Sequence, residues 1–244
     1  MNPGLTLATA GRVLTQVRHD PRTIGLLILV PSLLLGLMAW IFTGTPVFGV
    51  VGPALLALFP FIAMFLVTSI TMLRERRSGT LERLMTLPLG RFDLVLGYAL
   101  AFGALAVVQA LIAVGFAVLV CGLTVAGDAW LLVLVALVDA LLGTTLGLMA
   151  SAFARTEFQV VQFLPALVFP QILLGGVFVP RDRMPDVLHA ISDWLPLSHA
   201  IEALQTVSTD ADGTATVVRE TVIVAAFAIA FVVLAAVTLR RSTR

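Results

Sequence analysis

The sequence predicts an all-α integral membrane protein with six transmembrane helices. Of its 244 residues, 59% are hydrophobic and only 12% are charged, whereas about 25% of an ordinary soluble protein is charged. Its mean hydropathy is +1.06. A soluble fold cannot bury this much apolar surface, and the same composition excludes a disordered chain. Backbone groups in lipid must be paired within their own segment, so we expect the spans to be helices.

Long stretches without charged residues locate the predicted spans. A helix needs about 20 apolar residues to cross the hydrocarbon core of a bilayer. The first charge-free stretch is long enough for two helices, and Gly44, Thr45 and Pro46 form a turn signal inside it. The predicted spans are residues 23–42, 47–73, 94–120, 130–154, 159–179 and 217–239.

The arginines set the expected orientation. All 15 basic residues are arginine, and 12 of them fall on the side that also receives both ends of the chain. The positive-inside rule places that side in the cytoplasm. Trp40, Trp130 and Trp194 lie near the opposite ends of the predicted spans, as an aromatic belt does. We therefore expect a multi-pass protein of a prokaryotic cell membrane with both termini cytoplasmic.

The first residues predict an amphipathic surface helix at 4–19. Ala10, Val13, Leu14 and Val17 recur at helical spacing, with arginines on the flanks. Such a helix lies along the inner membrane surface. A plain membrane anchor is the alternative that periodicity alone leaves open.

The loop between the second and third spans contains a short predicted helix at 78–88. Thr80 can cap this helix, Glu82 lies in its first turn, and Pro88 marks its end. Its apolar side chains share one face, which suits docking in a groove of another protein. The residues of this face are Leu81, Leu84 and Met85. A solvated loop on the positive side of the membrane is the alternative.

The same loop resembles a family signature. Glu75, Arg76, 79–82, Leu84, Pro88 and Arg91 are similar to the pattern E-R-x-x-G-T-L-E-x-L-x-x-x-P-x-x-R of type-2 permeases of ATP-binding-cassette (ABC) exporters. A second stretch, in the fifth span and the outer segment after it, resembles the same family, including 163–165, 173–176 and 194–198. The most similar branch contains the drug- and antibiotic-resistance permeases.

The resemblance implies a transport subunit that works with other chains. Two permease subunits, as a homodimer or a homologous heterodimer, would sit on two copies of a cytoplasmic ABC ATPase subunit. The segment at 78–88 would be the coupling helix, seated in a groove of the ATPase. The implied ATPase-coupling residues are Glu75, Gly79, Thr80, Leu81, Glu82, Arg83, Leu84, Met85 and Pro88.

The resemblance also implies the cargo and the energy source. An amphiphilic, drug-like or lipid-like substrate would leave the cell, with ATP and Mg bound on the partner ATPase and no cofactor on this chain. The chain contains no lysine, and an ATP-binding P-loop requires one. We therefore expect no catalytic residue and no enzymatic activity of the chain alone.

In such permeases the substrate follows the interface between the two subunits. The implied substrate-path residues here are Phe59, Phe65, Gln162, Phe163 and Phe169. A phenylalanine in a membrane helix can equally face lipid or pack in the bundle. The segment at 181–207 predicts two short amphipathic helices separated at Pro196, similar to the family's outer re-entrant helices.

Three polar residues stand apart from these patterns. Asp139 is the only carboxylate deep in a predicted span, so proton coupling or binding of a charged substrate group is one hypothesis. A hydrogen bond, to Gln109 or to a backbone group, is the structural alternative. His189 and His199 lack a third nearby ligand, so we expect no metal site. A net charge of +1 also argues against nucleic acid as a partner.

Several other functions remain open at the level of sequence. The chain could be a secondary transporter or a membrane subunit not driven by ATP, or it could export a lipid or polysaccharide precursor. A lipid-modifying membrane enzyme would need clustered acidic or histidine residues, which the sequence does not contain. A structural or regulatory subunit has no distinguishing sequence feature. Dependence on ATP rather than on an ion gradient separates the ABC permease from the secondary transporter.

Overall fold

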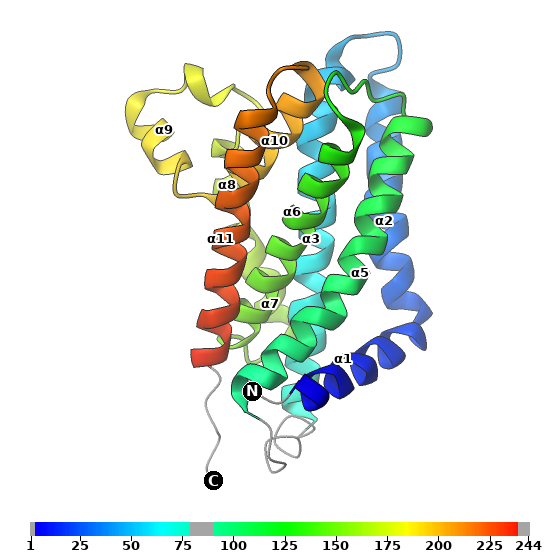
Figure 1. Ribbon diagram of the computed structural model, residues 1–244, viewed down its shortest axis with the longest axis vertical. Helices are drawn as coiled ribbons and strands as arrows, with labels where there is room; N and C mark the ends of the chain where they lie inside the picture. Colours follow the sequence, from blue (N-terminus) through cyan, green and yellow to red (C-terminus); the bar gives the residue numbers. More distant parts are fainter. Residues whose placement is uncertain (1–2, 79–89, 239–244) are drawn as a thin grey trace.

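The computed structural model describes residues 3–78 and 90–238, and within these ranges the protein is helical and has no strands. Six helical segments are long and apolar enough to cross a membrane, which confirms the predicted all-α fold with six candidate spans. Five are the continuous helices α2 (Pro21–Ile41), α3 (Val47–Arg77), α5 (Arg91–Leu119), α6 (Ala129–Ser151) and α11 (Thr214–Thr238). They run side by side in one bundle (Figure 1).

The sixth candidate span is interrupted. The sequence predicts a single helix at 159–179, but the structure has α7 (Glu157–Leu167) and α8 (Phe169–Leu174), which meet at Val168. Pro170 has no backbone N–H to donate to the preceding turn, and its ring crowds that turn, so a continuous helix is disfavoured here. The chain then turns at Gly176, whose φ of +88° suits glycine.

Helix α1 (Pro3–Arg18) crosses one end of the bundle obliquely, below α5 (Figure 1). Ala10, Val13 and Val17 are buried and belong to the core cluster that includes residues of α5. At the crossing, a Cβ on Gly97 would lie 2.8 Å from Cβ of Thr9, so glycine permits the close approach. The apolar face of α1, which the sequence analysis expected to contact the membrane, therefore packs against α5 instead.

Helices α3 and α6 form the centre of the bundle and run in the same direction. A Cβ on Gly143 would lie 2.5 Å from the carbonyl oxygen of Phe61, and a Cβ on Gly147 would lie 2.6 Å from that of Phe65. Only glycine fits at these two contacts, one helical turn apart. Small residues allow membrane helices to approach in this way and gain dispersion contacts along their length.

The other end of the bundle carries three short elements: the 3-10 turn η1 (Arg181–Arg183), α9 (Asp186–Ser192) and α10 (Pro196–Thr209). We call it the α10 end and the opposite one the α1 end. Helix α10 begins at Pro196, where the sequence predicts the break. The backbone N–H groups of Ala126 and Gly127 donate to the carbonyls of Ser208 and Val207, which joins the α5–α6 loop to α10.

Candidate functional site

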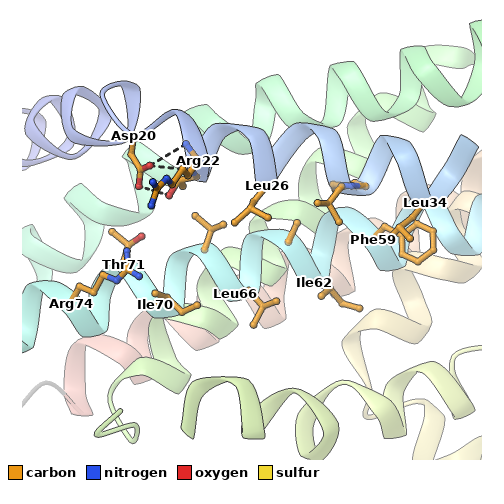
Figure 2. Close-up of a pocket in the computed structure, with 15 residues that line it drawn as sticks. Asp20, Arg22, Leu26, Leu34, Phe59, Ile62, Leu66, Ile70, Thr71 and Arg74 are labelled. Atoms are coloured by element: carbon orange, nitrogen blue, oxygen red, sulfur yellow. Dashed lines mark hydrogen bonds between the residues drawn. The ribbon is translucent and has the colours of Figure 1, made fainter. Parts of the chain in front are cut away.

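A groove of about 600 Å³ runs between α2 and α3. Figure 2 shows apolar side chains of both helices along it, with Leu34 and Phe59 toward one end and Arg22 and Arg74 at the other. Its apolar lining consists of Leu26, Val30, Pro31, Leu34, Phe59, Ile62, Ala63, Leu66, Val67 and Ile70. The hydrophobic effect makes such a lining suitable for an alkyl or aromatic group.

Polar groups gather where the groove reaches the α1 end. Asp20 caps α2: its carboxylate accepts hydrogen bonds from the backbone N–H groups of Arg22 and Thr23 and from the Thr23 hydroxyl at 2.7 Å. These bonds, led by that of the Thr23 hydroxyl, lower the pKa of Asp20. Arg74 is held by two bonds, of 2.8 and 3.1 Å, to the Glu157 carboxylate on α7. The groove is therefore amphipathic, with charged groups at one end only.

An ion pair joins α1 to the last turns of α3. Arg12 Nη1 lies 3.1 Å from Glu75 Oε1, and Arg12 Nη2 donates to the hydroxyl of Tyr98 on α5 at 2.6 Å. Glu75 is 5% exposed and Arg12 is 34% exposed. Burial opposes the charge of Arg12, but the bond to Glu75 and the field of Tyr98 outweigh it, so the pKa of Arg12 is raised. Three helices thus share one charged contact.

The neighbouring arginine attaches α3 to a fourth helix. Arg76 donates from Nη1 to the carbonyl oxygen of Ser151, the last residue of α6. Arg74, Glu75 and Arg76 are successive residues of α3. They contact α7, α1 and α6, respectively. The last turns of α3 are therefore attached to three other helices.

The predicted site residues do not gather in one place. Phe59 lines the groove. Phe65 is fully buried in the core, Phe163 is half-buried on α7, and Gln162 and Phe169 are exposed. Of the predicted coupling residues, Glu75 makes the ion pair above. The others, Gly79, Thr80, Leu81, Glu82, Arg83, Leu84, Met85 and Pro88, lie outside the described residues.

Several residues that build this region escaped the sequence analysis as site candidates. Arg12 is 63 residues from Glu75 in the sequence, Tyr98 is 86 residues from Arg12, and Glu157 is 83 residues from Arg74. No local spacing connects such pairs. The Glu75–Arg76 part of the loop signature was the one available signal that these positions matter.

The prediction of a hydrogen bond between Asp139 and Gln109, the structural alternative given above, is wrong. Gln109 Nε2 donates instead to the carbonyl oxygen of Leu27 at 2.9 Å. Asp139 is completely buried, and neither of its carboxyl oxygens has a hydrogen-bond partner among the described residues. An ionised carboxylate is expensive in this setting. Across the described ranges, no three His, Cys, Asp or Glu side chains come together as metal ligands.

A bundle in which six helical segments of the described residues are long and apolar enough to cross a membrane is typical of a multi-pass membrane protein. The model of the ABC-2 type transporter family matches residues 5–208, so the chain belongs to that family. This membership confirms the family resemblance described above.

Named relatives come from both bacteria and a eukaryote. The probable multidrug ABC transporter permease YbhR of Escherichia coli (strain K12) is 29% identical over 60% of this chain and 40% of its own length. The linearmycin resistance permease protein LnrN of Bacillus subtilis (strain 168) is 29% identical over 55% of this chain and 34% of its own. ABC transporter G family member 20 of Dictyostelium discoideum is 26% identical over 63% of this chain and 21% of its own length. Each of these matches thus covers 40% or less of the relative's own length.

Proposed function

We propose that the chain is the permease subunit of an ABC exporter that moves an amphiphilic, drug-like or lipid-like substrate out of the cell. The observation that carries this proposal is the groove between α2 and α3, which is apolar along its length and charged at the α1 end. An apolar part of a substrate fits its wall, and a polar part fits the charged end. Family membership and the resistance permeases among the relatives favour export.

A separate ATPase supplies the energy in this proposal. The 244 residues contain no lysine, so they hold no P-loop to bind the phosphates of ATP. Two copies of a cytoplasmic ABC ATPase, with their ATP and Mg, would bind below two permease subunits. The lipid bilayer surrounds this assembly, and both termini of the chain face the cytoplasm.

Coupling to the ATPase would take place at the α1 end. The proposed coupling helix at 78–88 follows directly on α3, whose last turns are held by α1, α6 and α7. A push on that helix would therefore reach α1, α6 and α7, as well as the α3 wall of the groove, together. Helix α1 would also contact the ATPase. At the α10 end, α9 and α10 would form the outer re-entrant segment that closes the exit.

Phe59 is the proposed path residue with the most direct support, because it lines the groove. For Gln162, Phe163 and Phe169, on the interrupted span, the proposal is that they meet the substrate at the contact with the second subunit. Phe65 is fully buried in the core, so it would reach the path only if the helices around it rearranged.

Reconstitution with an ABC ATPase subunit that copurifies with the permease tests the proposal. We expect hydrolysis of ATP by the complex to rise when an amphiphile is added, and none by the permease alone. Ala63 lines the groove, so Ala63→Trp fills it and should abolish the stimulation. Ala104→Trp, on the exposed face of α5, is the matched control and should retain it. Transport that follows an ion gradient without ATP would instead identify a secondary transporter.

A further inference from the structure

The charged end of the groove between α2 and α3 offers a ligand more hydrogen-bond donors than acceptors. Arg22 lines it from α2 and Arg74 lines it from α3, at the same end as Asp20 (Figure 2). A guanidinium carries five N–H donors, and that of Arg22 has no hydrogen bond or ion pair in the part of the chain that the structure describes. Arg74 gives two of its donors to Glu157 and keeps the others.

The carboxylates of this end are already engaged. Asp20 accepts three hydrogen bonds from residues at the start of α2. Both oxygens of Glu157 accept from Arg74, and the positive charge of Arg77 also acts on this carboxylate. Three arginines, including Arg22, therefore accompany two carboxylates. The charge that remains uncompensated is positive, and the polar groups that remain free are donors.

The rest of the groove offers a long apolar wall. From Phe59 to Arg74 it follows 15 residues of α3, which span about 22 Å at a rise of about 1.5 Å per residue. The opposite wall, on α2, is exposed at Leu26, Val30 and Leu34. An alkyl chain can therefore enter from the side and lie along both helices. In that position, a headgroup at one end of the chain reaches the arginines.

We propose that the groove binds an amphiphile with a long alkyl chain and an anionic headgroup, a sulfate or phosphate ester, held by Arg22 and Arg74. This inference rests on the proposed export function and deepens it, because that function leaves the charge of the substrate open. Sulfate and phosphate oxygens match the planar donor fork of a guanidinium. A quaternary ammonium group has no acceptor and would meet two arginines, so a cationic amphiphile binds more weakly. A membrane phospholipid and a single-chain cargo share the required chemistry.

Photocrosslinking in phosphatidylcholine nanodiscs, without ATPase or ATP, measures this preference. The probe is hexadecyl sulfate with a diazirine near its methyl end, and mass spectrometry locates its adducts. We expect adducts near Leu34 and Phe59, at the opposite end of the groove from Arg22 (Figure 2). At equal mole fraction in the bilayer, unlabelled hexadecyl sulfate should displace the probe about fivefold better than hexadecanol, because an exposed ion pair changes an affinity by up to about that factor.

Two further competitors complete the comparison of headgroups. Hexadecyltrimethylammonium should displace the probe least. Phosphatidylglycerol, added to the nanodisc, distinguishes the two sources of the anionic group. Displacement equal to that by hexadecyl sulfate supports the proposal with a membrane lipid as the occupant. Weaker displacement supports it with a single-chain cargo, provided that hexadecyl sulfate retains its advantage over hexadecanol.

Variants at Arg22 test the assigned headgroup site. Arg22→Gln should reduce the advantage of the sulfate over hexadecanol to about twofold or less, and Arg22→Glu should make the ammonium compound the best competitor. Both should fold, because Arg22 is exposed in the first turn of α2, where glutamate is favourable. Arg155→Gln is the matched control and should keep the parent preference, since Arg155 is exposed between α6 and α7 and does not line the groove.

Three results would overturn the inference: equal displacement by all headgroups, an unchanged preference in Arg22→Gln, or adducts only on residues outside the groove. The assay also separates this inference from the proposed function. Stimulation of ATP hydrolysis by amphiphiles without a headgroup preference would refute the inference alone. A headgroup preference without any stimulation in the complex would refute the proposed function alone.

Discussion

Removing the guanidinium of Arg12 should destabilise the protein by an amount that the structure allows us to estimate. Arg12→Ala leaves Glu75, which is 5% exposed, without its ion-pair partner. Loss of one partner of a buried pair costs about 3–5 kcal/mol. Because Arg12 is 34% exposed, water screens part of the interaction, and we expect a loss of about 2–3 kcal/mol. For a chain of this length, this corresponds to a fall in Tm of roughly 4–12 °C.

Thermal unfolding of the purified permease in detergent measures this loss. Arg18→Ala is the matched control, since Arg18 lies on the same helix and is exposed, and it should leave Tm within about 2 °C. Glu75→Gln removes the other charge of the pair. A double-mutant cycle should then give a coupling energy of about 1–3 kcal/mol. If Arg12→Ala behaves like Arg18→Ala, or if the two substitutions are additive, the ion pair does not join α1 to α3.

Three further predictions concern single positions. Asp20 caps α2 and its pKa is lowered, so its carboxylate stabilises the fold above about pH 4 and this contribution is lost as the pH falls through the lowered value; Thr23→Val, which removes one of its bonds, should lower Tm more at pH 7 than at pH 2, and an equal or larger loss at pH 2 would contradict this. Gly147→Ala places a Cβ 2.6 Å from the carbonyl oxygen of Phe65 and should cost about 1–3 kcal/mol in thermal unfolding; an unchanged Tm would show that α3 and α6 are not so close. Asp139→Asn should change the free energy of unfolding by less than about 0.5 kcal/mol, since the carboxyl has no hydrogen-bond partner among the described residues; a large loss would reveal a partner, and lost transport at unchanged Tm would favour a functional role.

The helical spans were predictable because the membrane imposes a simple rule. Apolar stretches of about 20 residues cross it as helices, and α2, α3, α5, α6 and α11 begin and end within a few residues of the charge-free stretches. The interruption at Val168 was harder to foresee. Pro165 and Pro170 both indicate distortion, yet α7 continues through the first proline and ends before the second.

The site was less predictable, because its contacts join residues far apart in the chain. The sequence does not show whether a phenylalanine lines a groove or lies in a core. Only the structure separates Phe59, which lines the groove, from Phe65, which is buried where α6 packs on α3. The partner of Gln109 is a carbonyl 82 residues away.

Composition, charge-free stretches and the loop signature determined by themselves that this is a six-helix membrane protein that resembles an ABC permease. They could do so because lipid acts on each segment separately and selects for apolar length. The tertiary structure alone decided which polar groups pair, where the groove runs, and that the apolar face of α1 packs on α5. Those features depend on the relative positions of helices, which close contacts such as those of Gly143 and Gly147 set and which local pattern does not encode.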